Sequence, residues 1–301
     1  MISLGARIVR LIIRMLTYRR RKEHKSLSRT VKFKSGRYVP PKSVSCRTEY
    51  FNGIRTEIFT PKDAEKFAVI FFHGGGHTVG MNDMYRKVAQ RYAKLCRCTV
   101  LCIDYKPGTE LKVPSVHNEC FSAYLGMTKE LKMPFAVAGD SFGANLMLYC
   151  TIKAREEGAN MPQAIVCISP YADMSASGQS YKTNCRNDPI YSLTRRQSFE
   201  ENEKYIRRIS PYCNGTPLKD SYLSPVYAKL NGLSDMLIIY GSYETSASDG
   251  EILQKNAVGN GVNVRLVAYE GMWHDFVYMT PFLKESRRAW RQISEFISAH
   301  F

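Results

Sequence analysis

The chain has 301 residues, a net charge of +16 and 44% hydrophobic residues. This length favours one large domain over two, and the composition is that of a globular protein with a sizeable core, which excludes disordered and fibrous classes. The nine cysteines are an odd number, and several lie in apolar runs. Such thiols indicate a reducing, cytoplasmic compartment instead of a disulfide framework. No cysteine and histidine spacing indicates a metal site, and we expect no cofactor.

Half of the net charge lies in residues 1–30, which hold nine Lys/Arg against Glu23 as the only acid. Residues 1–18 predict an amphipathic helix whose arginines share a polar arc roughly 80° wide. Three arginines inside the run exclude a transmembrane span, and their interleaving excludes a signal peptide. Two interpretations stay open. Residues 1–25 bind the inner surface of a membrane, or the wide apolar face docks on the protein as a cap over the active-site mouth.

The polar stretch 26–45 reads as a linker, so we divide the chain into an N-terminal segment, residues 1–45, and a catalytic domain, residues 46–301. Asn52-Gly53 predicts a hairpin turn between two alternating strands. Apolar strands and helices alternate after it. The expected strands are 46–51, 54–59, 67–72, 98–103, 135–138, 164–168, 236–240 and 262–268, and the expected helices are 83–95, 116–130, 142–157, 250–258 and 283–298.

Continuous apolar strands alternating with helices predict an α/β fold with a mostly parallel sheet covered on both faces. The stretch 171–225 breaks this rhythm with Gly, Ser, Asn, Pro and a charged helix near 195–208. We interpret it as an insertion that forms a lid over the carboxyl ends of the strands. Its tyrosines, Tyr171 among them, suggest an aromatic pocket, although exposed tyrosines in an ordinary loop explain them nearly as well.

A serine stands at the centre of Gly139-Asp-Ser-Phe-Gly143, between an expected strand and an expected helix. A serine at such a tight strand-to-helix turn has a strained backbone and projects its hydroxyl above the sheet edge. Ser141 is therefore the candidate nucleophile. His73-Gly-Gly-Gly76 follows another strand, and its backbone N–H groups, with that of Phe142, suit a tetrahedral oxyanion. A phosphate loop is the alternative, but the Lys-Ser/Thr that it requires is missing.

A nucleophilic serine needs a base and an orienting acid. His274 lies in the loop after the last expected strand, at the same sheet edge as Ser141, and is the candidate base. Glu244 follows the strand before it and is the preferred acid, with Asp249 as the alternative acid. His77 is a candidate pocket residue. The chain order of serine, acid and histidine is that of α/β-hydrolases.

From about residue 65 to the end, the sequence resembles the hormone-sensitive-lipase-like family of α/β-hydrolases, also called family IV bacterial esterases. The matching motifs are His73-Gly-Gly-Gly76, Asp104-Tyr-Lys106, Gly139-Asp-Ser-Phe-Gly-Ala-Asn145, Ser169-Pro-Tyr-Ala-Asp173 and Gly271-Met-Trp-His-Asp-Phe276. The resemblance implies a triad of Ser141, Glu244 and His274. It also implies oxyanion donors from Gly74, Gly75 and Phe142, and a cap formed by the N-terminal region and the 171–225 insertion.

The chain departs from the family pattern in three places. Phe142 and Ala144 replace smaller residues, which narrows the acyl pocket. Glu244 stands where aspartate is usual, so the extra methylene must be accommodated. The context of the acid has become Glu244-Thr-Ser-Ala-Ser-Asp249, which keeps Asp249 as an alternative.

These observations predict a serine carboxylesterase that acts through a covalent acyl-enzyme, and the resemblance to the family implies short-chain, acetyl-like esters as substrates. An amidase or deacetylase with the same triad is the nearest alternative. A non-catalytic small-molecule receptor of the same fold is the second, and an interaction protein tethered through its basic arm is the third. We expect a small-molecule ester substrate, no nucleic acid, and leave a homodimer open.

Overall fold

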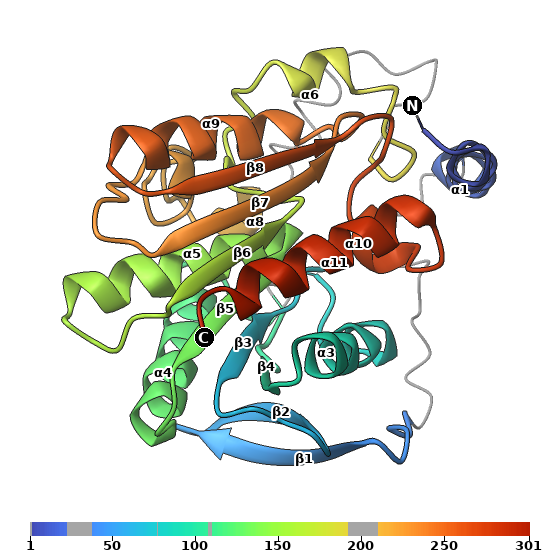
Figure 1. The fold of residues 1–301 in the computed structure, drawn as a ribbon. Coiled ribbons are helices and arrows are strands. Elements are labelled where there is room, and N and C mark those ends of the chain that lie inside the picture. The colour runs from blue at the N-terminus through green and yellow to red at the C-terminus, as the bar shows by residue number, and fades with distance from the viewer. Residues whose placement is uncertain (1, 23–37, 77, 108–109, 192–209) are drawn as a thin grey trace.

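The computed structural model describes residues 2–22, 38–76, 78–107, 110–191 and 210–301. In these residues eight strands form one sheet in the order β1-β2-β4-β3-β5-β6-β7-β8 (Figure 1). The strands are β1 Val44–Phe51, β2 Ile54–Pro61, β3 Ala68–Phe72, β4 Thr99–Ile103, β5 Phe135–Asp140, β6 Ala164–Ile168, β7 Asp235–Gly241 and β8 Val264–Tyr269. Each expected strand is present, with bounds that differ by at most two residues.

Only β2 runs against the other described strands, because it pairs antiparallel with both β1 and β4. The hairpin between β1 and β2 turns at Asn52 and Gly53, whose φ angles are 48° and 81°. Positive φ at both central residues is what a two-residue turn between twisted strands requires. From β4 to β8 all described pairings are parallel, so the carboxyl ends of these strands meet at one edge.

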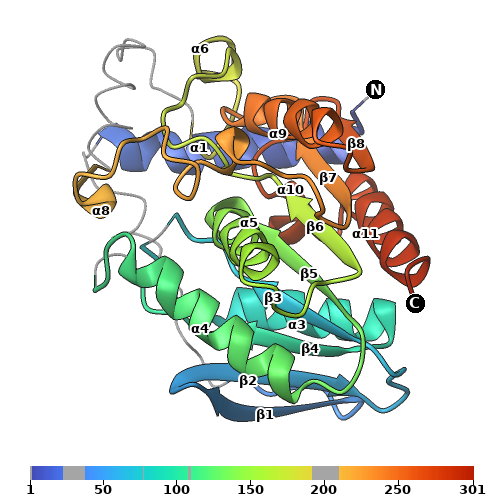
Figure 2. The same cartoon turned by 90° about the vertical axis from the view of Figure 1, so that its left-hand side faces the viewer.

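Helices cover both faces of the sheet, as Figure 2 shows. The longer ones are α3 Asp83–Cys96, α4 Ser115–Glu130, α5 Ser141–Glu156, α9 Ala247–Gly259 and α11 Lys284–Ser298. Ile70 and Phe72 of β3 pack in one apolar cluster with α4, α5 and α9. Val69 and Phe71 pack in a second cluster with α3 and α11. The strand is therefore buried on both faces, which explains its continuous apolar sequence.

The stretch 171–225 is irregular where the structure describes it. It contains short helices, α6 Ser180–Thr183 and α8 Ser210–Cys213, and ends at η1 Pro225–Tyr227. The expected charged helix near 195–208 lies outside the described residues. A further short helix that the sequence did not indicate, α10 Phe276–Met279, follows the loop after β8.

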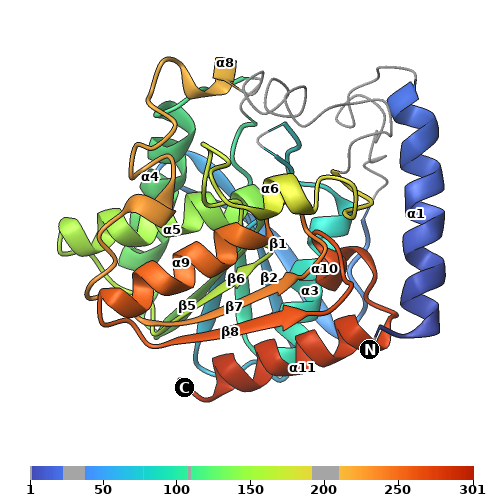
Figure 3. The same ribbon diagram turned by 90° about the horizontal axis from the view of Figure 1, so that it is seen from above.

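The first helix, α1 Leu4–Lys22, lies along one edge of the molecule beside α10 and the start of α11 (Figure 3). It packs on the body, as one of the two interpretations expected, but not through the whole of its apolar face. Part of the polar arc faces inward, with Ser3 bonded to Glu285 and Thr17 bonded to the carbonyl oxygen of Pro189. Much of the apolar face points outward instead.

All nine cysteines are free thiols, and seven of them are buried. In the described part of the chain, no helix is long and apolar enough to cross a membrane.

Candidate active site

Ser141 sits at the turn between β5 and α5 with a positive φ of 49° and is almost fully buried. Two glycines make this turn possible. A Cβ on Gly143 would overlap the carbonyl oxygen of Phe72 at the end of β3, and one on Gly139 would lie 2.8 Å from the carbonyl oxygen of Gly143. The elbow is thus pressed against the neighbouring strand, and side chains at these positions would push it away. This close packing holds Ser141 in its strained backbone conformation.

His274 lies in the loop between β8 and α10 and faces Ser141. Its Nε2 is 2.8 Å from the Ser141 Oγ. The structure therefore brings together a serine and a histidine that are 133 residues apart in sequence. Their loops start from β5 and β8, whose carboxyl ends lie at the same edge of the sheet.

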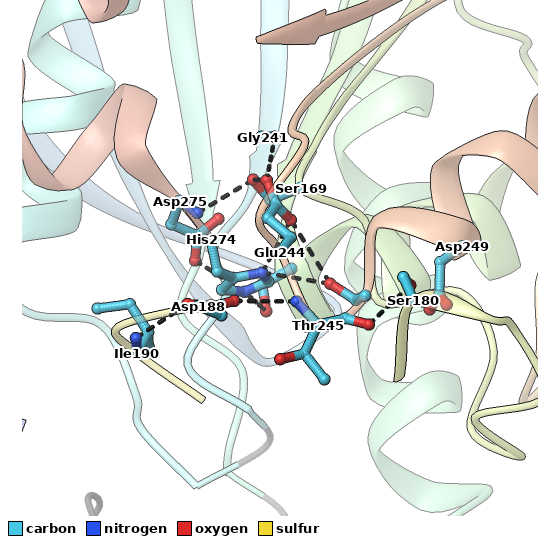
Figure 4. A network of polar contacts seen from close by, with 12 residues as sticks. Ser169, Ser180, Asp188, Ile190, Gly241, Glu244, Thr245, Asp249, His274 and Asp275 are labelled. Carbon is cyan, nitrogen blue, oxygen red and sulfur yellow. Dashed lines mark hydrogen bonds and ion pairs between the residues drawn. The ribbon is translucent and has the colours of Figure 1, made fainter. Parts of the chain in front are cut away.

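Glu244 follows β7 and holds the other side of the imidazole. Its Oε2 is 3.2 Å from the His274 Nδ1, and the Glu244 side chain is completely buried. The second oxygen, Oε1, accepts hydrogen bonds from the Ser169 hydroxyl at 2.7 Å and from the Gly241 N–H at 2.5 Å. These two donors fix the carboxylate, so the extra methylene of glutamate is accommodated without loss of contact with His274. Figure 4 shows this arrangement.

The alternative acid, Asp249, lies apart from His274 at the start of α9 (Figure 4). Its Oδ2 accepts hydrogen bonds from the backbone N–H groups of Ala172 and Asp173 and from the Tyr181 hydroxyl. Asp249 therefore anchors the start of the 171–225 stretch to α9. The sequence alone preferred Glu244 but kept Asp249 as an alternative, because the context of the acid departs from the family pattern.

Two further carboxylates, which the sequence did not indicate, lie near His274. The Asp275 Oδ2 lies 3.3 Å from the His274 Nε2, on the side of the ring that faces Ser141. Asp188 is completely buried and accepts hydrogen bonds from the Ile190 and Thr245 N–H groups. Asp275 directly follows the histidine, but Asp188 lies in the irregular stretch, where no strand end indicated its position.

These negative charges dominate the electrostatics of the base. Burial alone would lower the pKa of His274, but the charge of Asp275 and the hydrogen bond and charge of Glu244 outweigh it. With a smaller contribution from Asp188 they raise the pKa of His274 to about 10. Burial in turn raises the pKa of Asp188 to about 6 and that of Asp275 to about 7, against the opposing charge of His274.

The glycine loop after β3 lies next to the elbow. Its His73 is buried, stacks on the Tyr105 ring with centroids 4.2 Å apart, and bonds through Nδ1 to the Gly74 carbonyl oxygen. Burial lowers the pKa of His73 to about 4, so the ring is neutral. The Gly74 N–H donates to the Asp140 carboxylate at 2.9 Å, so Gly74 could reach an oxyanion only by sharing this bond. Gly75 has a φ of 112°, which only glycine readily adopts.

Of the two candidate pocket residues, the structure describes only Tyr171. Tyr171 lies beside the elbow, because its N–H donates to the Ser141 carbonyl oxygen at 3.1 Å and its own carbonyl accepts from the Asn145 amide. His77 lies outside the described residues. Across the described ranges, no group of three or more His, Cys, Asp or Glu side chains is arranged to hold a metal ion.

Comparison with known proteins bears on the fold and on the class of enzyme. A family model described as alpha/beta hydrolase fold matches residues 69–278. An esterase of Acinetobacter venetianus is 25% identical over 260 residues, which cover 85% of this chain and 83% of that protein. An acetyl-hydrolase of Streptomyces hygroscopicus is 28% identical over 224 residues, or 73% and 72% of the two chains.

A solved structure of an esterase from the bacterial hormone-sensitive lipase family superposes with a TM-score of 0.85 at 26% identity, covering 99% of this chain and 98% of that one. The chain therefore belongs to the α/β-hydrolase fold family. Within it, the chain is a member of the hormone-sensitive-lipase-like, or family IV, esterases, which are serine carboxylesterases.

Proposed function

We propose that the protein hydrolyses carboxylic esters with short, acetyl-like acyl groups through a triad of Ser141, His274 and Glu244. The observation that carries this proposal is the hydrogen-bonded chain from the Ser141 Oγ to His274 at 2.8 Å and from His274 to Glu244 at 3.2 Å. All three side chains are buried, so their mutual orientation is held before any substrate arrives. Such a chain is the arrangement in which a histidine activates a serine hydroxyl.

In the proposed reaction, the neutral imidazole of His274 accepts the Ser141 proton while the serine oxygen attacks the ester carbonyl. The tetrahedral intermediate collapses to an acyl-enzyme as His274 returns the proton to the leaving alcohol. His274 then removes a proton from water, whose oxygen attacks the acyl-enzyme. As the bond to the Ser141 oxygen breaks and the carboxylic acid leaves, His274 returns that proton to the serine. Glu244 keeps the Nδ1 proton in place, so that Nε2 is the nitrogen that accepts the proton.

The oxyanion needs N–H donors beside the Ser141 hydroxyl. We assign this role to Gly75 and Phe142, with Gly74 contributing if it shares its bond to Asp140. A single donor of this kind is worth roughly 3 kcal/mol to the transition state. Phe142 follows the nucleophile directly, and the glycine loop packs against the elbow through Gly143 and Phe72.

The preference for short acyl groups rests on the bulk around the elbow. Phe142 is completely buried and meets the Tyr212 ring edge-on, with centroids 5.3 Å apart. A phenylalanine in this position leaves less room for the acyl group of a substrate than the small residue that is usual in the family. The acetyl-hydrolase named among the relatives supports the same substrate class. Tyr171, which lies beside the elbow, and His77 are proposed pocket residues.

The proposal extends to the domain organisation and the location of the protein. We assign residues 1–45 and the stretch 171–225 to a cap on a catalytic domain formed by residues 46–301, since α1 and the described parts of the stretch touch through Thr17 and Pro189. Free thiols support a cytoplasmic location. The outer face of α1, where large apolar side chains are exposed, is the surface that we assign to contact with a membrane or with a second copy.

The test is hydrolysis of p-nitrophenyl esters of increasing chain length by wild type and Ser141→Ala, with fluorophosphonate labelling of both. Turnover that disappears with the mutation and falls as the acyl chain lengthens would support a short-chain esterase. Matched acetyl amides in the same assay separate an amidase or deacetylase. A folded protein that neither turns over an ester nor reacts with the probe would contradict the proposal and favour a non-catalytic receptor.

A further inference from the structure

The outer face of α1 is a continuous apolar surface that points away from the protein. At about 100° per residue its large side chains share an arc roughly 140° wide. They are Leu4, Ile8, Leu11, Ile12, Met15 and Leu16. Leu4, Leu11 and Met15 are 74%, 56% and 61% exposed. A contiguous group of this kind is unusual on a globular protein and marks a surface that binds something apolar.

The opposite face of α1 attaches the helix to the body. Ser3 bonds to Glu285 at the start of α11 through both its N–H and its hydroxyl. Arg10 lies over the Tyr243 ring at 4.7 Å, and the Thr17 hydroxyl donates to the Pro189 carbonyl oxygen at 2.9 Å. The helix is therefore held with its apolar arc outward at three points along its length. The apolar arc is therefore exposed while α1 is packed on the folded protein.

Positive charge borders this apolar arc. Arg7 and Arg14 are exposed at one edge of it, and the sequence continues after it with Arg19-Arg-Arg-Lys22. The segment that joins α10 to α11 runs beside α1 in Figures 1 and 3 and exposes Phe282. The exposed residues Lys284, Arg287 and Arg288 follow it. An apolar strip bordered by cations fits an interface with apolar chains beneath negatively charged headgroups.

We propose that the outer face of α1 binds an anionic lipid surface, with its six apolar side chains entering the headgroup boundary. Two residues on the inner face of α1 contact the neighbours of active-site carboxylates, since Pro189 adjoins Asp188 and Tyr243 adjoins Glu244. Docking through α1 therefore places these active-site loops close to the lipid surface. The docking surface itself does not depend on the reaction proposed for Ser141.

A second copy of the chain is the other occupant to consider. Two copies that met through this face would bring together two sets of the same arginines and lysines, from chains with a net charge of +16 each. Like charges at an interface oppose association, whereas an anionic headgroup layer complements them. Charge therefore favours the lipid surface over a symmetric dimer.

Sedimentation with lipid vesicles tests the proposal. Wild type is compared with Leu11→Gln/Met15→Gln, which removes two apolar side chains from the centre of the arc without changing charge or helix propensity much. The matched control is Leu95→Gln/Val258→Gln, because these side chains are 44% and 49% exposed on α3 and α9. The vesicles are equimolar phosphatidylcholine and phosphatidylglycerol, or phosphatidylcholine alone. Thermal midpoints are measured to verify that all variants are folded.

Wild type and the control should bind the anionic vesicles, more weakly at high salt, and bind phosphatidylcholine poorly. The α1 variant should partition about tenfold less or weaker still. Equal binding by the α1 variant and wild type would overturn the proposal, as would a wild type that ignores anionic vesicles at low salt. Light scattering that finds a wild-type dimer and a monomeric α1 variant, without vesicle binding, would assign the face to a second copy instead.

Discussion

Replacing Glu244 by glutamine tests the assignment of the acid most directly. The carbonyl oxygen of the new amide is expected to stay where Ser169 and Gly241 donate their hydrogen bonds. The amide NH₂ group then faces the His274 Nδ1, 3.2 Å away in the wild type, and donates to it. His274 would carry its proton on Nε2, the nitrogen that must accept the Ser141 proton, so the base is held in the wrong tautomer.

The expected loss follows from that tautomer. The same exchange of acid for amide in a serine protease triad lowers kcat by about 10⁴, which corresponds to about 5.4 kcal/mol of activation free energy. Since Glu244 is buried behind His274, we expect the loss in kcat and little change in KM. The measurement is steady-state hydrolysis of p-nitrophenyl acetate, with Ser141→Ala as the background.

Asp249→Asn is the matched control. The Asp249 Oδ2 accepts all three of its hydrogen bonds, and a single amide oxygen can accept them too. Burial and the charge of Asp173 raise the pKa of Asp249 well above its usual range, so a neutral side chain suits the site. kcat should stay near wild type. If Glu244→Gln lost less than about tenfold, the reasoning would be wrong, and Asp188 would be the next acid to replace.

Three further predictions concern the surroundings of the triad. Asp275→Asn removes the negative charge nearest to the His274 Nε2, so the pKa of His274 should fall from about 10. Because only neutral His274 can act as a base, the rising limb of the kcat/KM profile should move to lower pH; an unmoved profile would exclude this effect. Gly143→Ala forces a Cβ into the Phe72 carbonyl, and the thermal midpoint should fall by several degrees with loss of turnover. Ser169→Ala leaves Glu244 with one donor fewer, which should lower kcat by roughly tenfold, with KM as the unchanged reference.

The strands could be predicted from sequence because a parallel strand buried on both faces is apolar throughout. Residues 164–168 and the strand starting at 135 were predicted to within a residue or two on this basis. The positions of Ser141 and His274 followed from the same fact, since residues just after parallel strands meet at one edge. The choice between Glu244 and Asp249 could not be made this way. Both follow β7, and the structure separates them by position: Glu244 contacts the His274 Nδ1, whereas Asp249 lies in the first turn of α9.

Sequence could not indicate Asp188, which lies in the irregular stretch, far from any strand end. Its charge acts on His274, and its two oxygens accept hydrogen bonds from the N–H groups of Ile190 and Thr245, which lie far apart in sequence. The orientation of α1 was equally hidden. A helical pattern shows that apolar and polar residues separate into arcs, but it does not show which arc faces the protein. Specific partners decided that, since Glu285 and the Pro189 carbonyl bind the polar residues Ser3 and Thr17.

The surplus of negative charge around His274 affects the pH range in which we expect the protein to hydrolyse esters. A triad needs one carboxylate, whereas here the charges of Glu244, Asp275 and Asp188 all favour the imidazolium. In the proposed reaction His274 carries an extra proton in the transition state, so these charges stabilise that state. The imidazolium cannot, however, act as the base in the free enzyme. Near neutral pH the charges stabilise the transition state but also reduce the fraction of His274 that is neutral. At a pH above the pKa of His274, only the stabilisation of the transition state remains. We therefore expect the proposed activity to rise into the alkaline range, with the charges of Asp275 and Glu244 as the main reasons.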